Sequence, residues 1–354
     1  MCPNTLSEKR KVLGLNLREG LGMYHVGIIG TGSYVPKRVL TNHDLEKMVE
    51  TSDKWILERT GIRERRIAAE EETNVTMGQL ALERAIENAR IDPKEIEMLV
   101  VGTNTNEPVW PSAAGHIAHL LNLHENMPFF DVQAGCTGFN YSLAMAEQFV
   151  KSGQYKTVAV VGSDKLSAIT NYKDRNTCVL FGDGAGAVVL RRRAKEGIIR
   201  SYLGGEYKLR DTLVLRKYAD NHRRFMWMNG NRVYAFAKGA MAESCLRVLD
   251  PDRTAGKKEL RSLLNHVDRI IPHQANERII NSAARHLESK LDLPDGAVKN
   301  KMIVTIHKYG NNSTASIPLA LDESLREGKL RTGDLVILVG FGAGLTYGAN
   351  LVRL

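Results

Sequence analysis

The 354-residue chain contains few cysteines and no long apolar run. Its four cysteines include no Cys-x-x-Cys pair, so we expect no disulfide scaffold, no metal and a reducing, cytoplasmic location. No apolar run approaches the about 18 residues of a membrane-spanning helix, and a mean hydropathy of −0.26 predicts a soluble protein with no membrane partner. Residues 1–22 lack the apolar core of a secretory signal, and we interpret them as an N-terminal extension.

The net charge of +9 is concentrated in one region. Residues 191–269 hold 19 Lys and Arg against 9 Asp and Glu. This region has no zinc-finger spacing, basic zipper or aromatic RNA-binding motif, so we expect no nucleic-acid partner. An acidic protein or a phosphate-bearing small molecule is the favoured partner, and a merely solvated basic face is the alternative.

Short apolar runs alternate with amphipathic stretches, which favours an α/β fold. In the first half we predict strands at 26–29, 98–101, 129–132 and 158–161, with helices at 77–88 and 139–150. In the second half we predict strands at 198–202, 267–271, 335–339 and 345–352, with helices at 233–248, 276–287 and 313–325. This order predicts two similar halves joined near residues 191–197, with the active site between them.

Three glycine clusters could be mistaken for nucleotide-binding loops. Gly30 and Gly32 follow a strand, but the third glycine of a dinucleotide fingerprint is missing and Pro36 stands where its helix would continue. We therefore reject a dinucleotide site. The clusters at 182–186 and 340–344 are typical of places where the backbone approaches another backbone or a substrate.

Cys136 lies at a predicted turn between a strand and a helix, among small residues. A helix N-terminus stabilises a thiolate, so we expect the pKa of this thiol to lie below its usual value and the sulfur to act as a nucleophile. A small buried cysteine is the alternative, and we prefer that interpretation for Cys178 and Cys245.

Two more polar side chains follow predicted strands and could serve a cysteine nucleophile. His273 comes after the strand at 267–271 and, among the ten histidines, has this context alone. Asn311 follows residues 303–306 and precedes another helix, where a role as a helix cap is the alternative.

Five segments together resemble the β-ketoacyl-acyl carrier protein synthase III family, condensing enzymes of the thiolase superfamily. They are, in chain order, DVQAGCTGFNYSLAMAEQFVKSG, RNTCVLFGDGAGAVVL, IPHQAN, KYGNNSTASIPLALDE and FGAGLTYGANLVRL. The resemblance extends from about residue 23 to the end. It implies a thiolase-like, five-layered α-β-α-β-α fold with an N-terminal half at 23–193 and a C-terminal half at 194–354, and it implies a homodimer.

The family's catalytic triad corresponds to Cys136, His273 and Asn311. The resemblance implies that Cys136 takes an acyl group from acyl-CoA, with acetyl-CoA as the expected primer. Malonyl-acyl carrier protein then loses CO2, and its enolate is stabilised by His273 and Asn311 before it attacks the acyl-cysteine. The backbone N–H groups of Cys136 and Ala343 correspond to the oxyanion hole. The reaction starts fatty acid synthesis and needs no cofactor, because acyl-CoA is a substrate.

The resemblance also assigns binding residues. Trp55 and Arg59 are expected to sandwich the adenine of CoA, with Thr60 beside them, and Arg175 and Asn276 are further expected contacts. Trp110 corresponds to the residue by which a partner subunit closes the acyl pocket, which suggests a short primer. The expected docking residues for acidic acyl carrier protein are Arg278, Lys238, Lys257 and Lys258, with Arg261 and Arg285 as possible helpers.

Other functions stay open at this stage. Phe341 stands where thiolases carry a second catalytic cysteine, so thiolase activity is not expected. The alternative enzyme is a specialised relative that transfers acyl groups or forms a ketide or quinolone precursor. A non-catalytic acyl-carrier-binding or nucleic-acid-binding protein is a third possibility, which rests on the positive charge alone.

Overall fold

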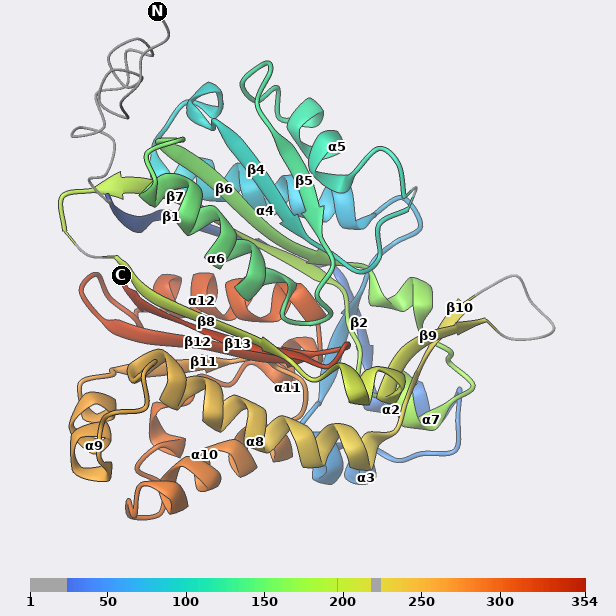
Figure 1. The fold of residues 1–354 in the computed structure, drawn as a ribbon. Helices are drawn as coiled ribbons and strands as arrows, with labels where there is room; N and C mark the ends of the chain where they lie inside the picture. Colours follow the sequence, from blue (N-terminus) through green and yellow to red (C-terminus); the bar gives the residue numbers. More distant parts are fainter. Residues whose placement is uncertain (1–23, 108, 196, 218–223) are drawn as a thin grey trace, which may run out of the picture.

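The computed structural model describes residues 24–107, 109–195, 197–217 and 224–354, so the predicted extension at 1–22 lies outside the described residues. Two main β-sheets alternate with three layers of helices (Figure 1). These alternating layers are the five-layered α-β-α-β-α arrangement that the resemblance implied.

The first sheet has the strand order β1-β7-β6-β4-β5. Its strands are β1 (His25–Tyr34), β4 (Met98–Gly102), β5 (Phe129–Val132), β6 (Thr157–Asp164) and β7 (Gly184–Arg193). β4 is parallel to β5 and β6, whereas β7 is antiparallel to β6 and β1. The outer face of this sheet is covered by α4 (Asn74–Ala89) and α5 (Ala113–Leu120).

The second sheet has the order β11-β12-β13-β8. Its strands are β8 (Ile198–Gly205), β11 (Arg269–Pro272), β12 (Leu335–Gly342) and β13 (Thr346–Arg353). The outer helices are α8 (Gly230–Leu249) and α10 (Glu277–Lys290), with α9 (Lys257–Asn265) at one end. The chain changes from the first sheet to the second between Arg193 and Ile198.

The middle layer consists of α6 (Gly138–Lys151) and α12 (Ser316–Arg326), which lie between the two sheets (Figure 1). Residues of both helices and of both sheets form one continuous apolar core. Nine consecutive residues from Ser316 to Ser324 are buried, because sheets cover this helix from both sides.

Smaller elements surround the carboxyl ends of the central strands. β2 (Arg38–Thr41) pairs with β3 (Glu64–Ile67), and α2 (Asn42–Glu46) and α3 (Asp53–Thr60) lie between them in the chain. β9 (Leu213–Lys217) and β10 (Arg224–Met228) form an antiparallel hairpin. The remaining short helices are Pro93–Glu95, Leu166–Ile169, α7 (Arg175–Cys178), Tyr207–Thr212, Lys299–Lys301, α11 (Ile306–Tyr309) and Ser313–Ala315.

Each predicted strand and helix corresponds to an observed one. The helix predicted at 313–325 is divided into a 3-10 turn at Ser313–Ala315 and α12. The hairpin of β9 and β10 was not predicted, and neither were β2, β3, α2, α3, α5 and α9. Gly30 and Gly32 lie inside β1, where an added Cβ would come within 2.3 Å of backbone oxygens of α4. These two glycines therefore allow the sheet to pack closely against α4, as the sequence interpretation expected.

Among the described residues, no helix combines the length and apolarity needed to cross a bilayer.

Candidate active site

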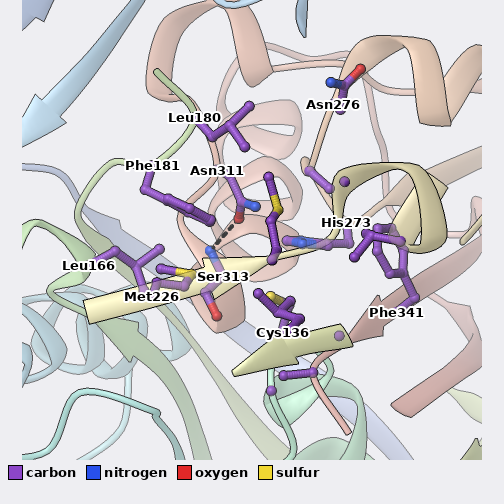
Figure 2. A pocket seen from close by; sticks show the side chains of 18 of the residues that line it. Cys136, Leu166, Leu180, Phe181, Met226, His273, Asn276, Asn311, Ser313 and Phe341 are labelled. Carbon is purple, nitrogen blue, oxygen red and sulfur yellow. Dashed lines mark hydrogen bonds between the residues drawn. The ribbon is translucent and has the colours of Figure 1, made fainter. Parts of the chain in front are cut away.

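Cys136, His273 and Asn311 line one cavity of about 590 Å³. Cys136 follows β5 and precedes α6, His273 follows β11, and Asn311 lies shortly before α12. Figure 2 shows the three side chains around a shared space, with Phe341 beside His273. The strand ends and helix starts that carry these residues meet at this point of the fold. Cys136 and His273, which are more than a hundred residues apart in the chain, therefore line the same cavity.

Two glycines bring the loop of Cys136 close to the end of β12. A Cβ on Gly135, which has φ +56°, would lie 2.4 Å from the nitrogen of Ala343, and a Cβ on Gly342 would lie 2.3 Å from the nitrogen of Cys136. This approach lets the backbone N–H groups of Cys136 and Ala343 both reach the sulfur of Cys136. Two donors that the sequence assigned to the oxyanion hole therefore converge on the nucleophile.

The prediction of a lowered pKa for Cys136 is wrong. Burial raises the pKa of this thiol to about 12 and outweighs the hydrogen bonds from Ser313 and from the two backbone N–H groups. Helix α6 begins at Gly138 after the N-cap Thr137, so the cysteine lies just outside the helix. The thiol is therefore protonated at rest.

His273 is 1% exposed, and burial lowers its pKa to about 3, so the imidazole is neutral at physiological pH. Its Nδ1 lies 2.7 Å from Oγ of Ser316, which also accepts a hydrogen bond from the backbone N–H of Gln274. We assign the hydroxyl of Ser316 as the donor to Nδ1, because its oxygen accepts from the N–H of Gln274 and its own proton is free. In this tautomer the ring proton resides on Nε2. The ring edge of Phe341 packs against the imidazole, with centroids 5.5 Å apart.

Asn311 is buried, and its side-chain orientation is fixed by one contact. Its Oδ1 accepts a hydrogen bond of 2.8 Å from the backbone N–H of Ser313, as Figure 2 shows. The Nδ2 group is therefore the part of the amide that remains to donate to a bound molecule. The site thus contains two neutral donors, His273 Nε2 and Asn311 Nδ2.

The residues predicted to bind CoA lie around the mouth of the cavity, which is lined by Trp55, Arg59, Thr60 and Asn276. Arg175 lies outside this lining, but its guanidinium is 5.0 Å from the centre of the Trp55 ring, closer than Arg59 at 6.0 Å. Both arginines therefore lie over Trp55, whereas the sequence assigned only Arg59 to the stack. The Thr60 hydroxyl donates to the carbonyl of Ile56 within its own helix.

Asn276 joins the two sides of the mouth. Its Nδ2 donates to the carbonyl of Arg59 at 3.0 Å, and its Oδ1 caps α10 by accepting from the N–H of Arg278. The exposed Arg278 side chain therefore starts from the rim of the cavity.

Two of the other predicted docking residues, Lys257 and Lys258, lie farther from this rim. Lys238 is exposed on α8, and Lys257 and Lys258 are exposed at the start of α9. Lys257 forms an ion pair of 2.9 Å with Asp292, beyond the far end of α10, and Arg261 pairs with the same carboxylate. Helix α10 has 14 residues, so about 20 Å separates its two ends. The structure therefore does not bring Lys257 and Lys258 together with Arg278.

Trp110 does not line the cavity of its own chain and is 87% exposed. It lies in the segment beside β5, where Asn106 Nδ2 and the N–H of Ala113 both bond to the Asp131 carboxylate of that strand. β5 is an edge strand, and Phe129 on it is 49% exposed.

Sequence reasoning missed several residues of the site. Asn104, Ser313 and Ser316 contact the triad or its neighbours, but they are ordinary polar residues with no distinguishing motif. The apolar wall contributed by the β9–β10 hairpin was also missed; its lining residues are Leu213, Val214, Leu215, Met226 and Met228. Within the described ranges, no group of three or more His, Cys, Asp or Glu side chains forms a metal site.

Comparison with known proteins identifies the family. Residues 130–206 match the family described as 3-oxoacyl-(acyl-carrier-protein) synthase III, and residues 260–354 match its C-terminal part. The beta-ketoacyl-(acyl-carrier-protein) synthase III of Actinobacillus succinogenes is 44% identical over 328 residues, which cover 92% of this chain and 98% of that protein.

Solved structures agree with this match. The 3-oxoacyl-(acyl-carrier-protein) synthase III of Aquifex aeolicus has a TM-score of 0.82 and 43% identity, covering 93% of this chain and 100% of that one. The priming β-ketosynthase of the R1128 polyketide pathway has a TM-score of 0.84 and 33% identity, covering 94% and 97%. The resemblance seen in the sequence is confirmed: this chain belongs to the β-ketoacyl-acyl carrier protein synthase III family.

Proposed function

We propose that this protein starts fatty acid synthesis by transferring the acyl group of a short acyl-CoA to Cys136 and condensing it with malonyl-acyl carrier protein. The product is a 3-oxoacyl-acyl carrier protein. The observation that carries this proposal is one cavity in which a cysteine sulfur meets two backbone N–H donors and two neutral side-chain donors.

The first step is acyl transfer. The sulfur of Cys136 attacks the thioester carbon, a bond forms between them, and the bond from that carbon to the CoA sulfur breaks. The thiol proton of Cys136 leaves with the CoA thiol, so no separate base accumulates a proton. The N–H groups of Cys136 and Ala343 meet the negative charge on the acyl oxygen.

The second step is decarboxylative condensation. Loss of CO2 from the malonyl group leaves an enolate, whose oxygen accepts hydrogen bonds from His273 Nε2 and Asn311 Nδ2. A neutral imidazole suits this role, because the lowered pKa of His273 keeps it uncharged and a donor rather than an acid. The enolate carbon then attacks the acyl carbon of the acyl-cysteine, and the bond from that carbon to the Cys136 sulfur breaks. The sulfur leaves as a thiolate and takes one proton from water to restore the thiol. No redox step occurs, so the reaction needs no cofactor.

Both acyl donors reach the cavity through the same mouth. Trp55 with Arg59 and Arg175 offers an aromatic face and two cations to the base and phosphates of CoA. Arg278 lies on the rim beside Asn276, where an acidic carrier protein must dock to insert its pantetheine arm. The separation of Lys257 and Lys258 from the rim leaves Arg278 as the principal docking residue.

The active form is a homodimer paired through β5. The strand offers an unpaired edge, and Phe129 and Trp110 add exposed apolar surface beside it. Trp110 then closes the acyl pocket of the second copy, which favours short primers. The free thiols of Cys136, Cys178 and Cys245 fit a cytoplasmic location.

The specialised alternative is less favoured, since identity reaches 44% with a beta-ketoacyl-(acyl-carrier-protein) synthase III and 33% with the priming polyketide ketosynthase. To test the proposal, the protein is incubated with acetyl-CoA and weighed intact. We expect one acetyl group on the Cys136 peptide, none in Cys136→Ala, and acetoacetyl-carrier protein once malonyl-carrier protein is added. Absence of the adduct, or a product other than the 3-oxoacyl thioester, contradicts the proposal.

A further inference from the structure

A buried carboxylate lies behind the nucleophile. Asp164 ends β6 and is fully buried. Its oxygens accept hydrogen bonds from the backbone N–H of Asn104 at 2.7 Å, from the hydroxyls of Thr103 and Thr105, and from both the N–H and the hydroxyl of Thr314. These donors come from the segment after β4 and the segment before α12. The carboxylate therefore joins two walls of the active site.

Asn104 extends this group into the cavity, which it lines together with Cys136. Its Nδ2 lies 3.2 Å from three acceptors: Asp164 Oδ2, the carbonyl of Gly135 and Oγ of Ser313. A carboxylate and a carbonyl can only accept, so the nitrogen of the amide, and not its oxygen, must face this group. Asn104 Nδ2 therefore acts only as a donor toward the Ser313 hydroxyl, and its two protons are shared among three acceptors.

Ser313 lies between Asn104 and the nucleophile. Its backbone N–H donates to Asn311, and Asn104 Nδ2 lies 3.2 Å both from its hydroxyl and from the carbonyl of Gly135, the residue before Cys136. The hydroxyl therefore lies beside the loop of the nucleophile, where its hydrogen bond lowers the pKa of the Cys136 thiol against the larger effect of burial. Since its oxygen accepts from Asn104, the hydroxyl proton is available to another acceptor. The sulfur of Cys136, negatively charged as it attacks, is such an acceptor.

We propose that Ser313 is a catalytic residue whose hydroxyl donates a hydrogen bond to the attacking sulfur of Cys136, and that Asn104 is the positioning residue that directs this proton. Asp164 holds Asn104 in place. During the attack the backbone N–H groups of Cys136 and Ala343 serve the acyl oxygen, so Ser313 gives the sulfur a donor of its own. The inference deepens the proposed function, on which it rests, by adding two residues to the acyl-transfer step.

The charges around the sulfur explain why such a donor matters. Asp164 places a negative charge near the thiol and raises its pKa. His273 is neutral and comes from the loop after β11, while Tyr234 on α8 is hydrogen-bonded to Ser282. Arg59 lines the mouth of the same cavity. Hydrogen bonds at the sulfur are therefore needed to offset both burial and Asp164.

The test measures how fast iodoacetamide alkylates the Cys136 peptide at several pH values in the wild type, Ser313→Ala and Asn104→Ala. Below the pKa of the thiol, the alkylation rate follows the thiolate fraction. Loss of one hydrogen bond to the charged sulfur should raise the pKa of the thiol by about one unit. The plot of the logarithm of the rate against pH then moves to higher pH by the same amount, which is a tenfold slower reaction at any given pH. Thr105→Val is the matched control, because Thr105 bonds to the same carboxylate without contacting Ser313.

We expect equal displacement in Ser313→Ala and Asn104→Ala, no further displacement in the double variant, and none in Thr105→Val. For acyl transfer we expect a lower kcat with an unchanged KM for acetyl-CoA. If the pH dependence of alkylation is unchanged in either single variant, or if the two effects add in the double variant, the inference is overturned. If Asn104→Ala does not fold, Asn104→Leu replaces it at similar volume. Alkylation uses neither CoA nor carrier protein, so this result is independent of the test of the proposed function.

Discussion

Substitution of Gly342 by alanine tests the close approach between β12 and the loop of the nucleophile. The added Cβ would lie 2.3 Å from the nitrogen of Cys136, whereas ordinary contacts start at 3.4 Å. The two backbones must therefore separate by about 1 Å, and such a displacement near reacting atoms costs about 100-fold in rate. Loss of one oxyanion donor gives a similar or larger decrease, about 100-fold to 1000-fold in kcat.

The expected result for Gly342→Ala is a decrease of about 100-fold in both acyl transfer and condensation, since both steps use the N–H groups of Cys136 and Ala343. The KM for acetyl-CoA should change little, because Trp55 and Arg59 are remote from the substitution. Single-turnover acetylation, followed by intact mass, measures the first step directly.

Gly239→Ala is the matched control for this experiment. Gly239 lies in α8, and an added Cβ there has no neighbour within 4 Å. It should retain full activity, with about 1 kcal/mol of added stability from its higher helix propensity. If Gly342→Ala folds normally and acetylates Cys136 within a few-fold of the wild-type rate, the geometric argument for the oxyanion hole is refuted.

Three further predictions concern other parts of the site. Ser316→Ala removes the hydroxyl that fixes the His273 tautomer, so decarboxylation should slow about tenfold while acetylation of Cys136 is unchanged; equal loss in both assays contradicts this assignment. Arg278→Glu should slow condensation with malonyl-carrier protein, more so at low salt, and leave transfer from acetyl-CoA intact; a salt-independent effect argues against docking. The folded pKa of His273, about 3, lies below its unfolded value of about 6.5, so this group's contribution to stability is lost as pH falls below 6.5. Denaturant titrations should show a loss of about 1.4 kcal/mol per pH unit between pH 6 and 4, and this slope should decrease in His273→Gln.

The sequence analysis selected three side chains, Cys136, His273 and Asn311, that the structure brings together in one cavity. The apolar runs before Cys136 and His273 indicated strands, and strand ends are where chemical groups of an α/β fold collect. Their roles, in contrast, required the family resemblance, because spacing alone left a buried cysteine and a helix cap as alternatives.

The pKa of Cys136 could not be predicted from local sequence. A helix start indicated a stabilised thiolate, but burial depends on segments such as β12 and the β9–β10 hairpin that lie far away in the chain. The same reason hid Asn104 and Ser316, whose importance comes from which way a hydroxyl or amide must donate. Such directions are properties of the assembled network.

The active site combines tightly packed elements of the middle layer with elements at the periphery of the molecule. Cys136 and Asn311 precede α6 and α12, which lie between the two sheets, so a substitution in these helices disturbs the packing of both sheets at once. The β9–β10 hairpin and α3, which lies at the mouth of the cavity, are peripheral elements. They pack less against the two main sheets than the middle-layer helices do. New acyl preferences can therefore evolve at the rim while the carbon–carbon bond-forming apparatus stays fixed inside.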